Sequence, residues 1–166
     1  MPDLVFQILS ARGSNDATGI AFNLAISQQH TTAQIRSIAL RCQIRIEPAR
    51  RKYSELQQHR LADLFGEPQR WGQTVRSMLW TNTAISVPSF SDSVEVDLPI
   101  TCADDAASKY LDALEDGEIP LTFLFSGTIF YTSRPHDPLQ IAMISHDTAA
   151  SFRLIAGVPL HRGAAL

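Results

Sequence analysis

The sequence has few cysteines and no long apolar run. Its 166 residues include two cysteines, Cys42 and Cys102, without the close spacing that zinc and iron–sulfur sites use. The longest apolar stretch, 119–131, is interrupted by polar and turn-forming residues and is shorter than the roughly 18 residues of a membrane helix. The start of the chain lacks the basic and apolar blocks of a signal peptide. We therefore expect a cytoplasmic protein with reduced thiols and no membrane partner.

Charged residues are also scarce, at 19% of the chain with a net charge of −3, whereas 45% of the residues are hydrophobic. This composition excludes a disordered chain and a long coiled coil. A chain of this length is typical of one globular domain. We therefore expect a single domain spanning 1–166.

Recognisable catalytic motifs are absent. The five histidines are scattered, without the spacing of a metal site, and no glycine-rich phosphate loop or nucleophile motif is present. The sequence predicts no cofactor and no metal, and it favours a protein that is not an enzyme. The alternative is a small enzyme whose site is assembled from distant residues, such as His136, His146 and an acidic residue near Asp116.

Alternation of apolar and polar residues, which is typical of strands, dominates the chain. The clearest case is 38–46, where Cys42 shares the apolar face with isoleucines and leucine while Arg41 and Arg45 face solvent. We expect a bulge at Gly127 in a later strand. The predicted strands are 4–8, 20–26, 38–46, 79–87, 94–98, 119–131 and 139–143, and the tail after Ala149 is ambiguous.

Two segments change to a helical pattern. Ser54 and Gln57 have the spacing of a capping box, and Gly66 is a plausible end for that helix. It belongs to a helical insertion of about 53–76. A second, short helix is expected to start at Asp104 or Asp105 and to end before Gly117.

Seven short strands separated by turns predict a mainly β protein, a two-sheet immunoglobulin-like antiparallel sandwich with a helical insertion. The alternative is an α+β fold in which two helices cover a single antiparallel sheet.

Charge is distributed unevenly along the chain. Residues 36–76 contain nine cations and four anions, a balance of +5, whereas 91–120 contain one cation and nine anions, a balance of −8. The two segments either neutralise each other side by side or create a bipolar surface that attracts a protein partner or favours self-association. The residues predicted to contact a partner are Arg41, Arg45, Arg50, Arg51, Arg70 and Trp71.

Nucleic acid is a less favoured partner. Cations and aromatic residues do occur together around Arg50 and Trp71, but the chain is acidic overall and has no nucleic-acid-binding motif. The tryptophans are expected to pack in the core or under the helical insertion.

Five segments carry a resemblance to a known family: Ser37–Pro48, Leu64–Trp71, Leu79–Thr81, Tyr110–Pro120 and Leu124–Tyr131. With these motifs the chain resembles a bacterial family of uncharacterised proteins, domain of unknown function 6084, over roughly 4–154. Because genes of that family lie beside [NiFe]-hydrogenase genes in some bacteria, the resemblance implies a scaffold or accessory role in assembling such an enzyme. Its members continue with helical sequence, which implies that a C-terminal segment is missing here.

Overall fold

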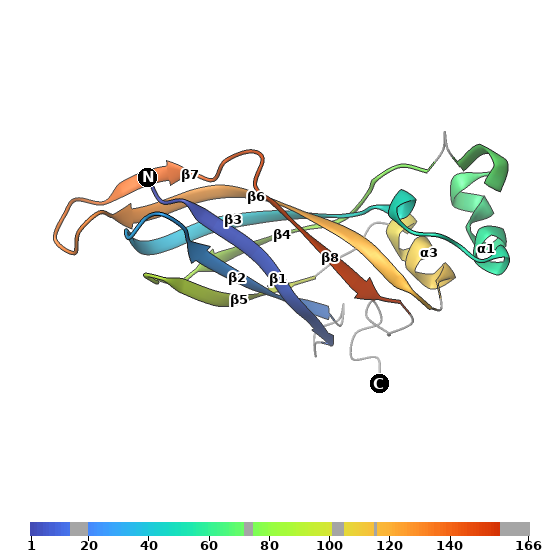
Figure 1. The fold of residues 1–166 in the computed structure, drawn as a ribbon, viewed down its shortest axis with the longest axis horizontal. Helices are drawn as coiled ribbons and strands as arrows, with labels where there is room; N and C mark the ends of the chain where they lie inside the picture. Colours follow the sequence, from blue (N-terminus) through green and yellow to red (C-terminus); the bar gives the residue numbers. More distant parts are fainter. Residues whose placement is uncertain (14–19, 72–74, 101–104, 115, 157–166) are drawn as a thin grey trace.

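The protein is a two-layer β sandwich with helices at one end (Figure 1). A computed structural model describes residues 1–13, 20–71, 75–100, 105–114 and 116–156. The prediction of a mainly β, two-sheet antiparallel protein is confirmed. The alternative of a single sheet covered by two helices is wrong, because the helices pack beyond the end of the strands.

The smaller sheet, sheet A, has three antiparallel strands in the order β1-β2-β5. Its members are β1 (Leu4–Gly13), β2 (Ile20–Gln28) and β5 (Ser93–Pro99). The larger sheet, sheet B, has the order β4-β3-β6-β7, and β8 pairs with β6. Its members are β3 (Gln34–Ile46), β4 (Met78–Val87), β6 (Glu118–Thr132), β7 (Gln140–Met143) and β8 (Ala149–Ile155).

The strand order resembles that of an immunoglobulin constant domain, with one strand moved. The first, second and fifth strands share a sheet, as do the third, sixth and seventh, which is the immunoglobulin pattern. The fourth strand, however, lies beside β3 in sheet B rather than beside the fifth. Strand β8, not expected from the sequence, continues the edge begun by β7 along β6.

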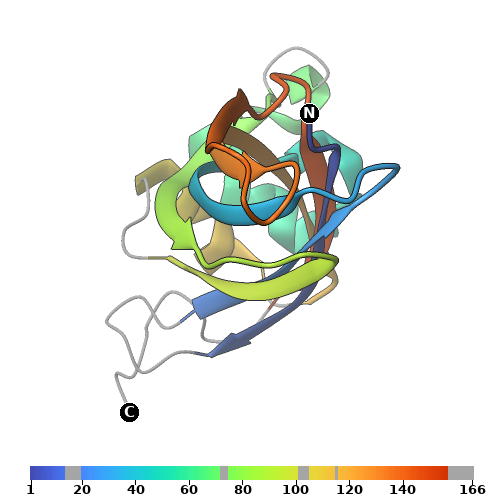
Figure 2. The ribbon, with the colours of Figure 1, turned by 90° about the vertical axis from the view of Figure 1, so that its left-hand side faces the viewer.

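Figure 2 shows the two sheets end-on from the β6–β7 hairpin. Apolar side chains from both sheets form the core between them. Phe6 of β1 stacks on Phe125 of β6 with their ring centroids 4.5 Å apart, and Phe22 of β2 packs edge-on against Phe123 at 5.0 Å. Aromatic pairs of this geometry contribute about 1 kcal/mol beyond their area. Cys42 lies in this core, as the alternation of β3 predicted.

The helical end contains η1 (Pro48–Arg50), α1 (Glu55–Phe65), η2 (Pro68–Arg70) and α3 (Asp105–Ala113). The predicted capping box of α1 is present, with Ser54 and Gln57 exchanging hydrogen bonds, and the helix ends at Gly66. Both α1 and η2 lie in the predicted insertion between β3 and β4. The start expected for the second helix at Asp104 lies outside the described residues.

Gly127 does not form the expected bulge, because β6 keeps its register with β3 there and pairs Gly127 with Leu40. The glycine serves a different need. Its φ is +137°, and an added Cβ would lie 2.0 Å from the carbonyl oxygen of Ala39. Only glycine allows two central strands to approach so closely at that φ.

Candidate interaction face

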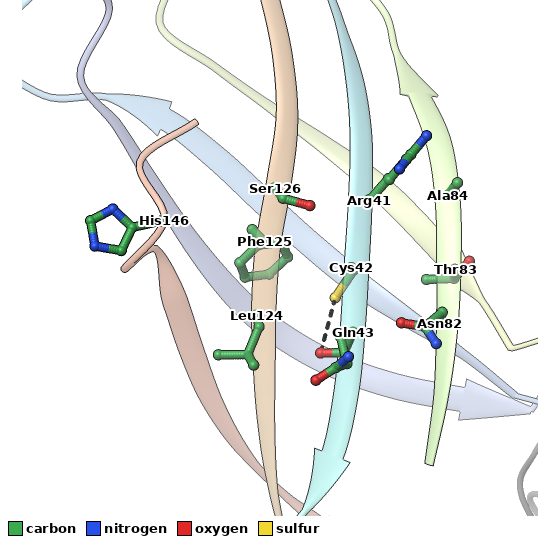
Figure 3. A pocket seen from close by; sticks show the side chains of 10 residues that line it. All are labelled: Arg41, Cys42, Gln43, Asn82, Thr83, Ala84, Leu124, Phe125, Ser126 and His146. Carbon is green, nitrogen blue, oxygen red and sulfur yellow. Dashed lines mark hydrogen bonds between the residues drawn. The ribbon is translucent and has the colours of Figure 1, made fainter. Parts of the chain in front are cut away.

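The outer face of sheet B, turned away from the core, is built by the alternation of its central strand. Arg41, Gln43 and Arg45 project outward from β3, between buried residues on the opposite side. In the register, Arg41 lies between Ala84 of β4 and Ser126 of β6. The side chain of Arg41 extends from β3 towards β4, near Ala84, and lines the hollow (Figure 3).

A hollow of about 580 Å³ opens on this face. Gln43 and Asn82 line one side, and Leu124 and His146 lie on the β6 side (Figure 3). His146 belongs to the link between β7 and β8, which stays against β6 because Phe125 N–H donates to the carbonyl of Thr148 at 3.0 Å. The hollow therefore rests on β4, β3 and β6 and on one anchored loop.

The charges of the two outer faces differ in sign. The strands of sheet B contain four arginines and one acidic residue, Glu118, at the helical end, a balance of +3. The strands of sheet A contain two acidic residues, Glu95 and Asp97, and one arginine, Arg12, which forms an ion pair with Asp97. The strands of sheet B therefore carry a balance of +3 and those of sheet A a balance of −1.

At the helical end the two oppositely charged segments meet instead. Arg51, from the basic segment, donates from Nη1 to the backbone carbonyls of Asp116 and Glu118 at 3.2 and 3.0 Å. Gln57 donates to the Asp116 carboxylate at 2.9 Å. Through these contacts the basic and acidic segments are joined at the helical end by hydrogen bonds rather than by an ion pair between charged side chains.

Large apolar side chains lie on the same outer face of sheet B. Met143 and Ile141 pair across the β6–β7 register with Thr128 and Phe130. The sequence predicted a strand here without assigning its faces; in the structure Ala142 is the buried residue of β7, and Ile141 and Met143 are exposed. In β7 the aliphatic residues alternate with Ala142, and this alternation indicates the exposed apolar patch.

The core side of the hollow offers no reactive thiol. Cys42 is 2% exposed, and burial raises the pKa of its thiol to about 12. Since the thiolate is the nucleophilic form, Cys42 is a packing residue. Cys102 lies outside the described residues.

The six residues predicted to contact a partner do not form one patch. Arg41 and Arg45 lie on β3, whereas Arg50, Arg51, Arg70 and Trp71 belong to the helical end. The side chain of Arg45 is held within the protein, since it donates to Ser77 Oγ at 2.8 Å and to Gln43 Oε1 at 3.2 Å.

Arg51 is a structural cation rather than a free one. Besides its bonds to the two carbonyls, it donates to Gln57 Oε1 at 3.2 Å, and its guanidinium carbon lies 4.9 Å from the ring centre of Tyr53. Trp71, as predicted, packs under the insertion, edge-on to Tyr53 and Phe65. Arg50 and Arg70 are exposed.

The residues of the alternative, enzymatic hypothesis are far apart. Asp116 precedes β6, His136 follows it, and His146 lies beside its middle. At about 3.4 Å per strand residue, each is separated from the next by roughly 25 Å or more. Proton transfer needs hydrogen-bond reach, so this set cannot act as one site. Over the described part of the chain, no group of three or more His, Cys, Asp or Glu residues is arranged to hold a metal.

Comparisons with known proteins give a family but no activity. No curated protein matches the chain. Among solved structures, a β-glucosidase from Kluyveromyces marxianus is similar to it at 9% identity with a TM-score of 0.30, over 93% of this chain and 15% of that one. None of the described helices is both long and apolar enough to cross a membrane. A family model described as "Family of unknown function (DUF6084)" matches residues 1–160, and the chain therefore belongs to that family.

Proposed function

We propose that this chain is a non-catalytic protein-interaction module whose contact surface is the outer face of sheet B. One observation carries the proposal: Leu124, Ile141 and Met143 are 39, 63 and 66% exposed on one face, which also presents Arg41. Most soluble surfaces expose such residues singly, whereas a group of them beside charged residues is typical of a protein contact.

The module is proposed to act as a scaffold or accessory factor in assembling a larger enzyme such as a [NiFe]-hydrogenase. The resemblance to the family supports this role. The structure supports only the more general role of a protein-interaction module, since the outer face of sheet B presents side chains suited to binding rather than to catalysis.

The test is co-purification of tagged protein from a host that carries the native genes, at low ionic strength. We expect a stoichiometric partner, and we expect the paired substitution Ile141→Ser and Met143→Ser to remove it. The matched control is Val5→Ser with Leu9→Ser, which changes two exposed apolar residues of β1 in sheet A. Recovery of no stoichiometric partner, or equal recovery by both pairs of variants, would contradict the proposal.

A further inference from the structure

The hollow on sheet B contains hydrogen-bond donors that no other described residue uses. Arg41 is exposed and, among the described residues, makes no hydrogen bond or ion pair. Gln43 accepts from Arg45 with its carbonyl oxygen, which leaves its amide N–H groups free to donate into the hollow. Asn82 and Ser126 add an exposed amide and a hydroxyl.

Acidic side chains are absent from the described lining of the hollow. Asp147 is adjacent in sequence to His146, but it accepts a hydrogen bond from Ser145 Oγ, which lowers the pKa of this exposed carboxyl. A planar guanidinium with several donors around it and no nearby carboxylate is suited to a carboxylate ligand, which it can bind through two parallel hydrogen bonds.

The exposed apolar residues fix where the rest of such a ligand would lie. Met143 lies two strands and two residues away from Arg41 in the register. With about 4.8 Å between strands and about 3.4 Å per residue, the two Cα atoms are about 12 Å apart. In an extended peptide, side chains four residues apart point the same way and are separated by about 13 Å.

Resting on the proposed function, we infer that the hollow binds an extended acidic segment of a partner protein. The partner's Asp or Glu carboxylate pairs with Arg41, and an aliphatic side chain four residues away packs on Met143 and Ile141. The intervening backbone crosses β6 over Ser126 and Thr128, which lie between Arg41 and Met143 in the register. The charge of the face selects an acidic partner, and the apolar patch supplies the buried area.

Two other occupants fit the face less well. A second copy would have to present the acidic face of sheet A, where Asp97 is already paired with Arg12. Nucleic acid binding usually needs several phosphate contacts and aromatic stacking surfaces, whereas the large exposed side chains here are aliphatic.

The experiment is selection of a displayed library of random short peptides on immobilised protein. Wild-type protein should enrich peptides in which an Asp or Glu lies four residues from a Leu, Ile, Val or Met. Arg41→Glu should reverse the charge preference towards Lys and Arg. Met143→Ser should keep the acidic preference and lose the aliphatic one. A selected peptide, synthesised separately, should bind Arg41→Gln about tenfold more weakly, a loss of about 1.4 kcal/mol.

Arg153→Gln is the matched control, because it removes the same charge from an exposed outward position of β8 in the same sheet. It should leave the selected peptides unchanged. Each variant is first checked for wild-type circular dichroism and thermal unfolding.

The selection would overturn the inference with any of three results: selected peptides without acidic enrichment, the same peptides selected by Arg41→Glu, or an effect of Arg153→Gln equal to that of Arg41→Gln. Concentration-dependent dimerisation that Arg41→Glu abolishes would assign the face to a second copy, and tight binding of a labelled single-stranded oligonucleotide would assign it to nucleic acid; either also overturns it. Capture of a native partner that depends on Met143 but not on Arg41 would reject the inference while leaving the proposed function standing.

Discussion

At Gly127 a missing side chain decides how closely the two longest strands can pair. Replacing Gly127 with Ala would place a Cβ 2.0 Å from the Ala39 carbonyl oxygen, at a φ of +137°. Backbone strain and overpacking each cost about 1–3 kcal/mol. We expect Gly127→Ala to lower the free energy of unfolding by about 3 kcal/mol, measured by urea denaturation.

Gly66→Ala is the control for this prediction, because Gly66 also has a positive φ, +76°, but an added Cβ there meets nothing within 4 Å. It should cost about 1–2 kcal/mol, less than Gly127→Ala, because it introduces backbone strain without a close contact. Equal effects of the two substitutions would show that the close approach of β6 to β3 is unimportant.

Cys42 should make stability depend on alkaline pH. Its pKa is raised from 9.0 to about 12 by burial, so above pH 9.0 the unfolded chain releases a proton that the native protein retains. The contribution of the neutral thiol is therefore complete below the unfolded pKa and is lost as the pH rises towards the folded pKa. The loss is about 1 kcal/mol by about pH 10.

The measurement is the free energy of unfolding of wild type and of Cys42→Ala between neutral pH and the alkaline range. The difference between the two free energies of unfolding cancels the pH-dependent contributions of the tyrosines and of Cys102, which both proteins share. The stability advantage of wild type should shrink as the pH rises above 9.0. An advantage that stays constant across this range would contradict the buried, neutral state of the thiol.

At the scale of the elements, one side chain of the helical end connects three segments of the chain. Arg51 connects the segment after η1 to the start of α1 and to the turn before β6. Replacing Arg51 with Met should leave the carbonyls of Asp116 and Glu118 and the amide of Gln57 without that donor. We expect faster amide hydrogen exchange in α1 and α3, with protection of β2, β3 and β6 unchanged.

Arg50→Met provides a neighbouring control, since Arg50 is exposed and, among described residues, has no side-chain bond to lose. It should leave exchange in both helices as in wild type. If Arg51→Met behaves the same way, Arg51 is a surface cation after all and returns to the set of partner-contact residues.

The sequence predicts individual elements better than their environment. Alternation located β3 and the inward position of Cys42, and a capping box located α1, because both patterns depend on residues close in the chain. Strand β8 was not predicted because Ala149, Ala150 and Ser151 have low strand propensity. Its strand conformation is instead stabilised by pairing with β6, a contact that the local sequence does not show.

At the scale of the whole molecule, the candidate face could be predicted only in part. The outward position of Arg41 follows from alternation, but the position of Arg51 depends on a turn 65 residues away in sequence. The placement of Met143 depends on which edge β7 joins. Contacts between distant segments decide which cations are free, and no short-range pattern contains that information.

The opposite charges of the two outer faces predict how partner capture depends on salt. Raising the ionic strength from about 0.1 M to about 1 M shortens the screening length from about 10 Å to about 3 Å. Capture by wild type should therefore weaken with salt. Arg41→Gln should start weaker and change less, since it lacks the main unpaired cation of the hollow.

Met143→Ser should also start weaker but keep the wild-type salt dependence, because it removes apolar contact area and no charge. The measurement is the fraction of partner retained on immobilised protein as salt is raised, with Arg153→Gln as the charge control. Parallel curves for Arg41→Gln and wild type would mean that the face binds through its apolar residues alone. In that case the uneven charge distribution serves contacts between segments of the chain itself and not the binding of a partner.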